Sequence, residues 1–275
     1  MVTRMSESVA RHGTWLLIWT VRVGALLVLL MTLLAVTLGM VGQFATRERI
    51  ILRNEPVARS LTSATIDVGR VDLRVRVDPA MEPGRITIMV RDAFESTRLE
   101  RRVTDGALYL RAQGRGGGFQ FGVLESLEVV LPPGLDLKIR SKTGEVRLDG
   151  PDGPVDVDTR IGDVEIHAPS SSALRVVSGS GEIFVGDARV GTLKAQAGGG
   201  TVTARFLAPP KKADVVTDSG DITLRLPGNP ADGYQVRANS GEGDTSVTVP
   251  RNTRSDHVVQ ARSSSGDVVV ATTRR

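Results

Sequence analysis

A short turn phrase recurs along the second half of the chain at nearly constant spacing. It joins a small polar residue, a glycine and an acidic residue to apolar residues at alternate positions, as in SGDITL around Gly220. Successive turn glycines lie 18 to 25 residues apart. They are Gly144, Gly162, Gly181, Gly200, Gly220, Gly241 and Gly266. A unit of about 20 residues cannot bury an apolar face alone, but stacked units can, so this repeat constrains the fold strongly.

Residues at fixed distances from these glycines are apolar in register. The apolar positions lie five and seven residues before each glycine and two and four residues after it. The column five residues before holds Ile139, Val157, Val176, Ala195, Val215, Val236 and Ala261. Because the offsets have a period of two, each glycine is predicted to join two strands that bury one face. We assign the seven glycines a structural role in the turns.

The pattern predicts an all-β fold, a β-solenoid of about seven or more coils. A two-sheet sandwich of consecutive hairpins is the alternative, but it does not explain why equivalent residues align. Weaker copies near Gly69, Gly84 and Gly106 place the β-strand-repeat domain at residues 61–275, most regular at 135–275. The sixth unit fits only with a two-residue insertion after Gly241, and 114–122 is predicted to be a loop.

An uncharged run of 20 residues, 23–42, precedes this domain. A helix of this length spans the apolar core of a bilayer, so we predict one N-terminal transmembrane helix at 23–44 that contacts membrane lipid. A cleaved signal peptide and a buried helix are the alternatives. Residues 1–22 form a short tail and 45–60 a linker. Three arginines precede the run and four follow it, so charge alone does not orient it. We expect a single-pass protein of the cell membrane with the β domain outside the cytoplasm, an orientation that rests partly on a family resemblance carried by residues 127–150 and the later turns.

An acid follows the turn glycine in six of the seven units. These acids are Glu145, Asp163, Glu182, Asp221, Glu242 and Asp267, with Thr201 as the exception. Stacked carboxylates could form a calcium ladder, since calcium prefers oxygen ligands. Ordinary turn chemistry explains the acids more simply, because Asp and Ser satisfy local backbone groups. We therefore predict no metal and no cofactor.

Residues suited to catalysis are scattered. The chain has no cysteine, which excludes thiol chemistry and disulfides. Its three histidines, His12, His167 and His257, lack a metal-binding spacing, and we predict structural or surface roles for them. The net charge of +4 comes from arginines intermixed with acids, so we expect no nucleic acid partner. The prediction is that the protein is not an enzyme.

The segment LEVVLPPGLDLKIRSKTGEVRLDG, residues 127–150, and the later turns resemble a known bacterial group. They are similar to the putative-adhesin family of unknown function, whose members have β-strand repeats and are often membrane-anchored. The resemblance covers roughly residues 61–275 and implies a fold like single-chain β-helices. It supplies no catalytic residues.

We expect a non-enzymatic membrane-anchored surface β-solenoid that acts as a binding, adhesion or scaffolding module, with an unknown protein or cell-surface ligand as partner. An accessory regulator of cell-envelope stress sensing through a membrane partner and a polymerising scaffold are the alternatives. The C-terminal coil, DVVVATTRR, is expected to end the stack with an open edge at Val268 and Val270. Self-association or partner docking at this coil is therefore predicted.

Overall fold

A computed structural model describes residues 24, 26–37, 47–51, 61–92, 97–114, 126–228 and 233–273. They belong to two compact units, one containing the residues up to 46 and the other beginning at Arg47. In the first unit, residues 24 and 26–37 are helical, and their leucines and valines are exposed. Among the described residues, no helix is both long and apolar enough to cross a membrane. The predicted anchor extends beyond the described helix at both ends and stays a prediction.

The second unit consists of strands that form two sheets. The strands are β1 (Arg47–Ile51), β2 (Ser63–Arg70), β3 (Asp72–Val77), β4 (Thr87–Asp92), β5 (Thr97–Thr104), β6 (Ala107–Gly114), β7 (Ser126–Leu131), β8 (Asp136–Thr143), β9 (Val146–Asp149), β10 (Val155–Ile161), β11 (Val164–His167), β12 (Ala173–Ser180), β13 (Ile183–Ala188), β14 (Thr192–Gly199), β15 (Val202–Phe206), β16 (Lys212–Ser219), β17 (Ile222–Leu226), β18 (Gln235–Ser240), β19 (Thr245–Val247), β20 (Val258–Ser265) and β21 (Val268–Thr272). Strand β1 lies inside the predicted linker, and the predicted 114–122 loop is described only at Gly114.

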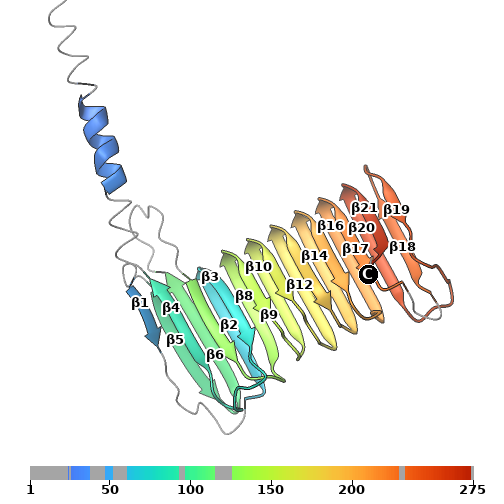
Figure 1. Ribbon diagram of the computed structural model, residues 1–275, viewed down its shortest axis with the longest axis horizontal. Helices are drawn as coiled ribbons and strands as arrows, with labels where there is room; N and C mark the ends of the chain where they lie inside the picture. Colours follow the sequence, from blue (N-terminus) through green and yellow to red (C-terminus); the bar gives the residue numbers. More distant parts are fainter. Residues whose placement is uncertain are drawn as a thin grey trace, which may run out of the picture. The chain divides into compact units, whose positions relative to one another are not determined.

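Each coil places one strand in each sheet. From β8 onward, consecutive strands do not pair with one another; each pairs in parallel with the equivalent strand of a neighbouring coil. Figure 1 shows the resulting two layers of strands, stacked coil on coil along the unit. The parallel pairing agrees with a β-solenoid and contradicts the alternative of consecutive hairpins.

The predicted apolar columns form the core between the sheets. Val157 pairs with Ile139 on one side and Val176 on the other, which is the register expected from the turn glycines. Val157 and Val176 are fully buried. Alternate residues point outward, because side chains along a strand alternate between its two faces.

The order of the coils differs from the chain order at both ends of the stack. The 10-stranded sheet runs β18-β20-β16-β14-β12-β10-β8-β2-β6-β5, and the 11-stranded sheet runs β1-β4-β7-β3-β9-β11-β13-β15-β17-β21-β19. The last coil of the chain, β20–β21, therefore lies between coils β16–β17 and β18–β19. At the other end, β4 and β5 pair in antiparallel fashion with β7 and β6.

This order corrects the expectation that Val268 and Val270 form an open edge. Both residues are completely buried, and β21 pairs with β17 on one side and with β19 on the other. The expectation placed the coils in the stack in the order of the chain. Every coil presents the same apolar columns, so the last coil fits an inner position of the stack as well as a terminal one. The open edges at this end belong to β18 and β19.

Candidate binding surface

The turn glycines hold adjacent coils in close contact. Gly144, Gly162, Gly181, Gly200, Gly220 and Gly266 all have positive φ angles, between 115° and 143°. A Cβ atom on Gly162 would collide with the backbone carbonyl oxygen of Gly144 in the neighbouring coil. Both the backbone conformation and the close packing therefore require glycine at this point of the turn.

Gly241 differs from the other six predicted turn glycines. Its φ angle is not positive. Gly243 takes its place in the turn, because its backbone packs against that of Gly266 as the other turn glycines pack against their neighbours. Strand β18 pairs Ala238 with Ala261 and Ser240 with Ser263. The first half of the sixth unit is thus shifted by two residues relative to the predicted register, while the second half pairs Thr245 with Val268 and Val247 with Val270 as the predicted insertion required; with Gly243 as the turn glycine, no insertion is needed.

Small hydroxyl residues three positions before the turn glycine link one coil to the next. The Ser263 hydroxyl donates to the carbonyl oxygen of Gly220 at 2.9 Å, and Ser240 donates to that of Gly266 at 2.7 Å. Thr217 makes a longer contact of the same kind with Gly200, at 3.3 Å. The side chains in this column are therefore small enough for the turn, and their hydroxyl groups also form hydrogen bonds between coils.

The acids after the turn glycines bind backbone amides of the adjoining coil. The amide of Glu182 donates to Asp163 Oδ1, and the amide of Asp267 donates to Asp221 Oδ1, both at 2.8 Å. The amide of Glu145 likewise donates to Asp72, at 2.9 Å. Within the described ranges, no group of three or more His, Cys, Asp or Glu side chains is arranged to hold a metal ion. The Asp carboxylates of the column are thus acceptors within the turns.

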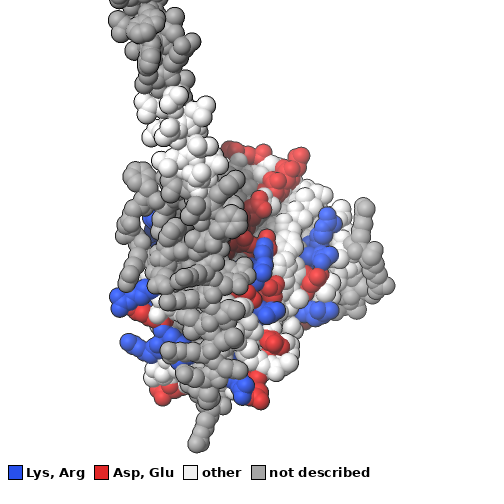
Figure 2. Space-filling view, turned by 60° about the vertical axis from the view of Figure 1, so that its left-hand side comes forward, with Lys and Arg blue, Asp and Glu red and all other residues white. Residues whose placement is uncertain are grey.

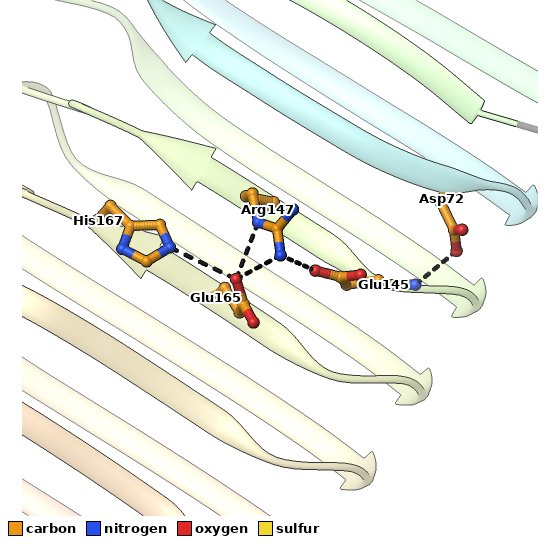
Figure 3. Close-up of polar contacts among 5 residues, drawn as sticks. All are labelled: Asp72, Glu145, Arg147, Glu165 and His167. Carbon is orange, nitrogen blue, oxygen red and sulfur yellow. Dashed lines mark hydrogen bonds and ion pairs between the residues drawn. The ribbon is translucent and has the colours of Figure 1, made fainter. Parts of the chain in front are cut away.

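A different arrangement lies on the outer face of the 11-stranded sheet, on β9 and β11 (Figure 3). Arg147 reaches both Glu145 and Glu165, with Nη2 at 2.6 Å from a carboxylate oxygen of each. Its Nε also donates to Glu165 Oε2 at 2.8 Å. His167 Nε2 lies 3.4 Å from the same Glu165 oxygen. One guanidinium group therefore joins carboxylates from two successive coils.

The contact between Arg147 and Glu165 shifts the pKa of both side chains. The hydrogen bond from Arg147, followed by that from His167, outweighs burial and lowers the pKa of Glu165. The bond to Glu165 in turn raises the pKa of Arg147. These side chains keep between 30% and 42% of their surface exposed, so water screens the pairs and their contribution to stability is small.

An aromatic ring extends the cluster onto β13. The rings of His167 and Phe184 are 5.5 Å apart and inclined at 51°. A Cβ atom on Gly186 would lie 2.8 Å from the Phe184 ring, so the absence of a side chain there leaves the room that the ring occupies. We call Glu145, Arg147, Glu165, His167 and Phe184 the charged-aromatic cluster. It does not recur with the repeat, since Thr203 and Thr223 continue the Phe184 position in the next two coils.

The repeat pattern of the sequence does not predict that these residues lie together. His167, for which a structural or surface role is predicted, lies in the charged-aromatic cluster, and its neighbours there come from outward positions that the apolar columns do not include. The 18-residue spacing of Arg147 and Glu165 equals one repeat and was the available signal. His257 lies elsewhere: its Nδ1 is 2.8 Å from the Pro210 carbonyl oxygen, and it packs against Tyr234. His12 lies outside the described residues.

Comparison with known families decides where the chain belongs. A family model described as Toastrack DUF4097 matches residues 134–274, slightly more than half of the chain. The chain belongs to the Toastrack family. The resemblance to a β-strand-repeat family of unknown function is thereby confirmed, whereas the match carries no information on a membrane anchor.

Several crystal structures are similar to this Toastrack protein. A putative cell adhesion protein from Clostridium sporogenes ATCC 15579 is 13% identical, with 82% of this chain and 98% of that chain covered and a TM-score of 0.37. A putative adhesin from Bacteroides fragilis NCTC 9343 is 12% identical, with coverages of 78% and 94% and a TM-score of 0.43. A putative lipid binding protein from Parabacteroides distasonis ATCC 8503 is 14% identical, with coverages of 83% and 96% and a TM-score of 0.33. Comparison with curated proteins gave no match.

Proposed function

We propose that this Toastrack protein is a non-enzymatic binding module, displayed at the cell surface by a single N-terminal membrane helix. The uncharged run at 23–42 supports the anchor. The domain that follows is a rigid stack whose turn glycines, hydroxyls and Asp carboxylates bind neighbouring coils. The outward-facing side chains are free to vary without disturbing these contacts, and they form the binding surface.

The charged-aromatic cluster is the observation that carries the proposal. Elsewhere on the outer faces, ion pairs such as Arg175–Asp156 join single residues of adjacent coils. Figure 2 shows basic and acidic side chains interspersed on one face, with acidic ones gathered along its upper edge. The cluster adds a partly exposed aromatic ring to a shared Arg–Glu network, and this combination of apolar and charged groups is typical of recognition surfaces.

Site-specific crosslinking on intact cells tests the proposal. A photocrosslinking amino acid replaces Phe184 in the full chain, and a matched variant carries it at Thr223, two coils away in the same outward column. We expect a discrete crosslinked product from position 184, and its loss when Arg147→Ala is added. Equal products from both positions, or none from position 184 on intact cells, would contradict a binding surface at the cluster.

A further inference from the structure

The stack ends at β18 and β19 in an apolar surface that no other described strand covers. Val236, Ala238 and Val247 are only partly buried there. Their counterparts in the adjoining coil, Val259, Ala261 and Val270, are completely buried. We call the edges of β18 and β19, with these three side chains, the open end.

The direction of the free backbone groups follows from the bonds at the start of β18. The Gln235 amide donates to the His257 carbonyl oxygen at 2.8 Å, on the side of β20. The Tyr234 amide donates to the Pro250 carbonyl oxygen at 2.9 Å, on the opposite side. Since amides alternate in direction along a strand, those of Val236 and Ala238 point toward the open edge. Within the described ranges, β20 is the only strand that pairs with β18.

The two ends of β18 carry opposite charges. Glu242 and Asp244 are exposed in the turn that follows β18. At the start, Arg251 and Arg254 outnumber one acid, Asp256; all three are exposed, and the backbone of Arg251 forms a β-bridge with Tyr234. Among the described residues, neither arginine has an ion-pair partner. The amide of Asp244 donates to Asp267 Oδ1 at 2.8 Å, and no described residue donates a hydrogen bond to the carboxylate of Asp244.

We propose that the open end docks onto the open end of a second copy of this chain, with the two β18 strands antiparallel across a two-fold axis. An isologous contact uses the same surface twice, and a two-fold axis reverses the strand direction. The reversal brings the acidic turn of each copy to the two arginines of the other. The charge distribution along β18 therefore fits a second copy of this chain.

Residues 250–252 set the register of this pairing between the two copies. They bond to the backbone of Tyr234 along the open edge, at the start of β18, and leave Val236 to Ser240 free for pairing. Antiparallel pairing of this stretch centres on Ala238 and places Arg237 opposite Asn239 of the second copy. No like charges then face each other, and the inward side chains of both copies form one continuous core. Like charges directly opposite would have been unfavourable.

Disulfide trapping tests the register directly, because the chain has no cysteine. The full chain carries Arg237→Cys and Asn239→Cys together, which this pairing places face to face at a distance suited to a disulfide. The control carries Lys138→Cys and Arg140→Cys, two exposed residues with the same spacing on the inner strand β8. Mild oxidation is expected to give a covalent dimer at least tenfold more abundant in the first variant. Equal yields, or monomer alone, would overturn the proposal.

Proline substitution separates docking from folding. Ala238→Pro removes an amide that points to the open edge, where proline is tolerated. Arg237→Pro removes an amide directed toward β20 and is expected to lower the melting temperature. Sedimentation of the detergent-purified full chain should show that Ala238→Pro reduces dimer at least tenfold while melting within a few degrees of the unmodified protein. A dimer that survives Ala238→Pro would overturn the proposal.

Discussion

Replacing Val176 by Asp provides the strongest test of the solenoid register. Val176 is completely buried on β12, between Val157 on β10 and Ala195 on β14. The substitution forfeits about 2 kcal/mol of apolar burial. Keeping the new carboxyl group neutral at pH 7 costs about 4 kcal/mol, because its unfolded pKa is about 3.9. We therefore expect a loss of about 5 kcal/mol or more.

Val177→Asp is the matched control, because Val177 is the adjacent residue and points to the outer face. Its effect is expected to stay within about 1 kcal/mol. In a domain of this size, 1 kcal/mol shifts the melting temperature by about 2–4 °C, so thermal unfolding followed by circular dichroism should separate the variants by about 10 °C or more. Equal melting temperatures would refute the register.

The sign of the pH dependence gives a second check on the same variant. Burial raises the pKa of Asp in the folded state, so the folded form of Val176→Asp retains a proton that the unfolded form releases at neutral pH. The penalty is fully present above the folded pKa and shrinks as the pH falls toward about 3.9. The gap between Val176→Asp and Val177→Asp should therefore be smaller at pH 4 than at pH 7.

Three further predictions concern the turns, the cluster and metal. Gly162→Ala should cost about 3 kcal/mol or more in chemical denaturation, since its φ is 141° and its Cβ would meet backbone, whereas Gly199→Ala, with open space, should change stability by about 1 kcal/mol or less. The lowered pKa of Glu165 means that its bond with Arg147 stabilises the fold above about pH 4.3 and is lost as the pH falls through the folded pKa. The stability difference between the unmodified protein and Arg147→Ala should thus disappear in acid; a difference that grows in acid would contradict this assignment. Melting temperatures in EDTA and in millimolar calcium should agree, whereas a metal bound at 100 times its Kd would add about 2.7 kcal/mol.

Much of the regular region could be predicted from the sequence because each coil repeats the same strand, glycine turn and strand. The alignment of Val157 with Val176 follows from turn glycines that can occupy only one point of the turn. The first half of the sixth unit is misaligned in the predicted register because the sequence there contains two glycines two residues apart, Gly241 and Gly243. Gly241 fits the column of Gly179 and Gly198, where a Cβ would also meet a carbonyl of the next coil.

The ends and the cluster could not be predicted in the same way. Coils with identical apolar columns can exchange places without a change in burial pattern, so the insertion of β20–β21 inside the stack has no signal in the columns. The antiparallel strands β4 and β5 lie where the glycine spacing becomes irregular. The charged-aromatic cluster depends on outward residues of three coils, among them Phe184, and on a missing side chain at Gly186, which lie outside the repeat pattern.

The topology of the chain in the membrane tests the central claim most directly. Because the chain has no cysteine, Lys142→Cys in the solenoid and Ser6→Cys in the N-terminal tail give two single labelling sites. A membrane-impermeant maleimide applied to intact cells should label position 142 and should reach position 6 only after permeabilisation. Labelling of position 6 on intact cells, with position 142 protected until permeabilisation, would contradict display of this Toastrack solenoid at the cell surface.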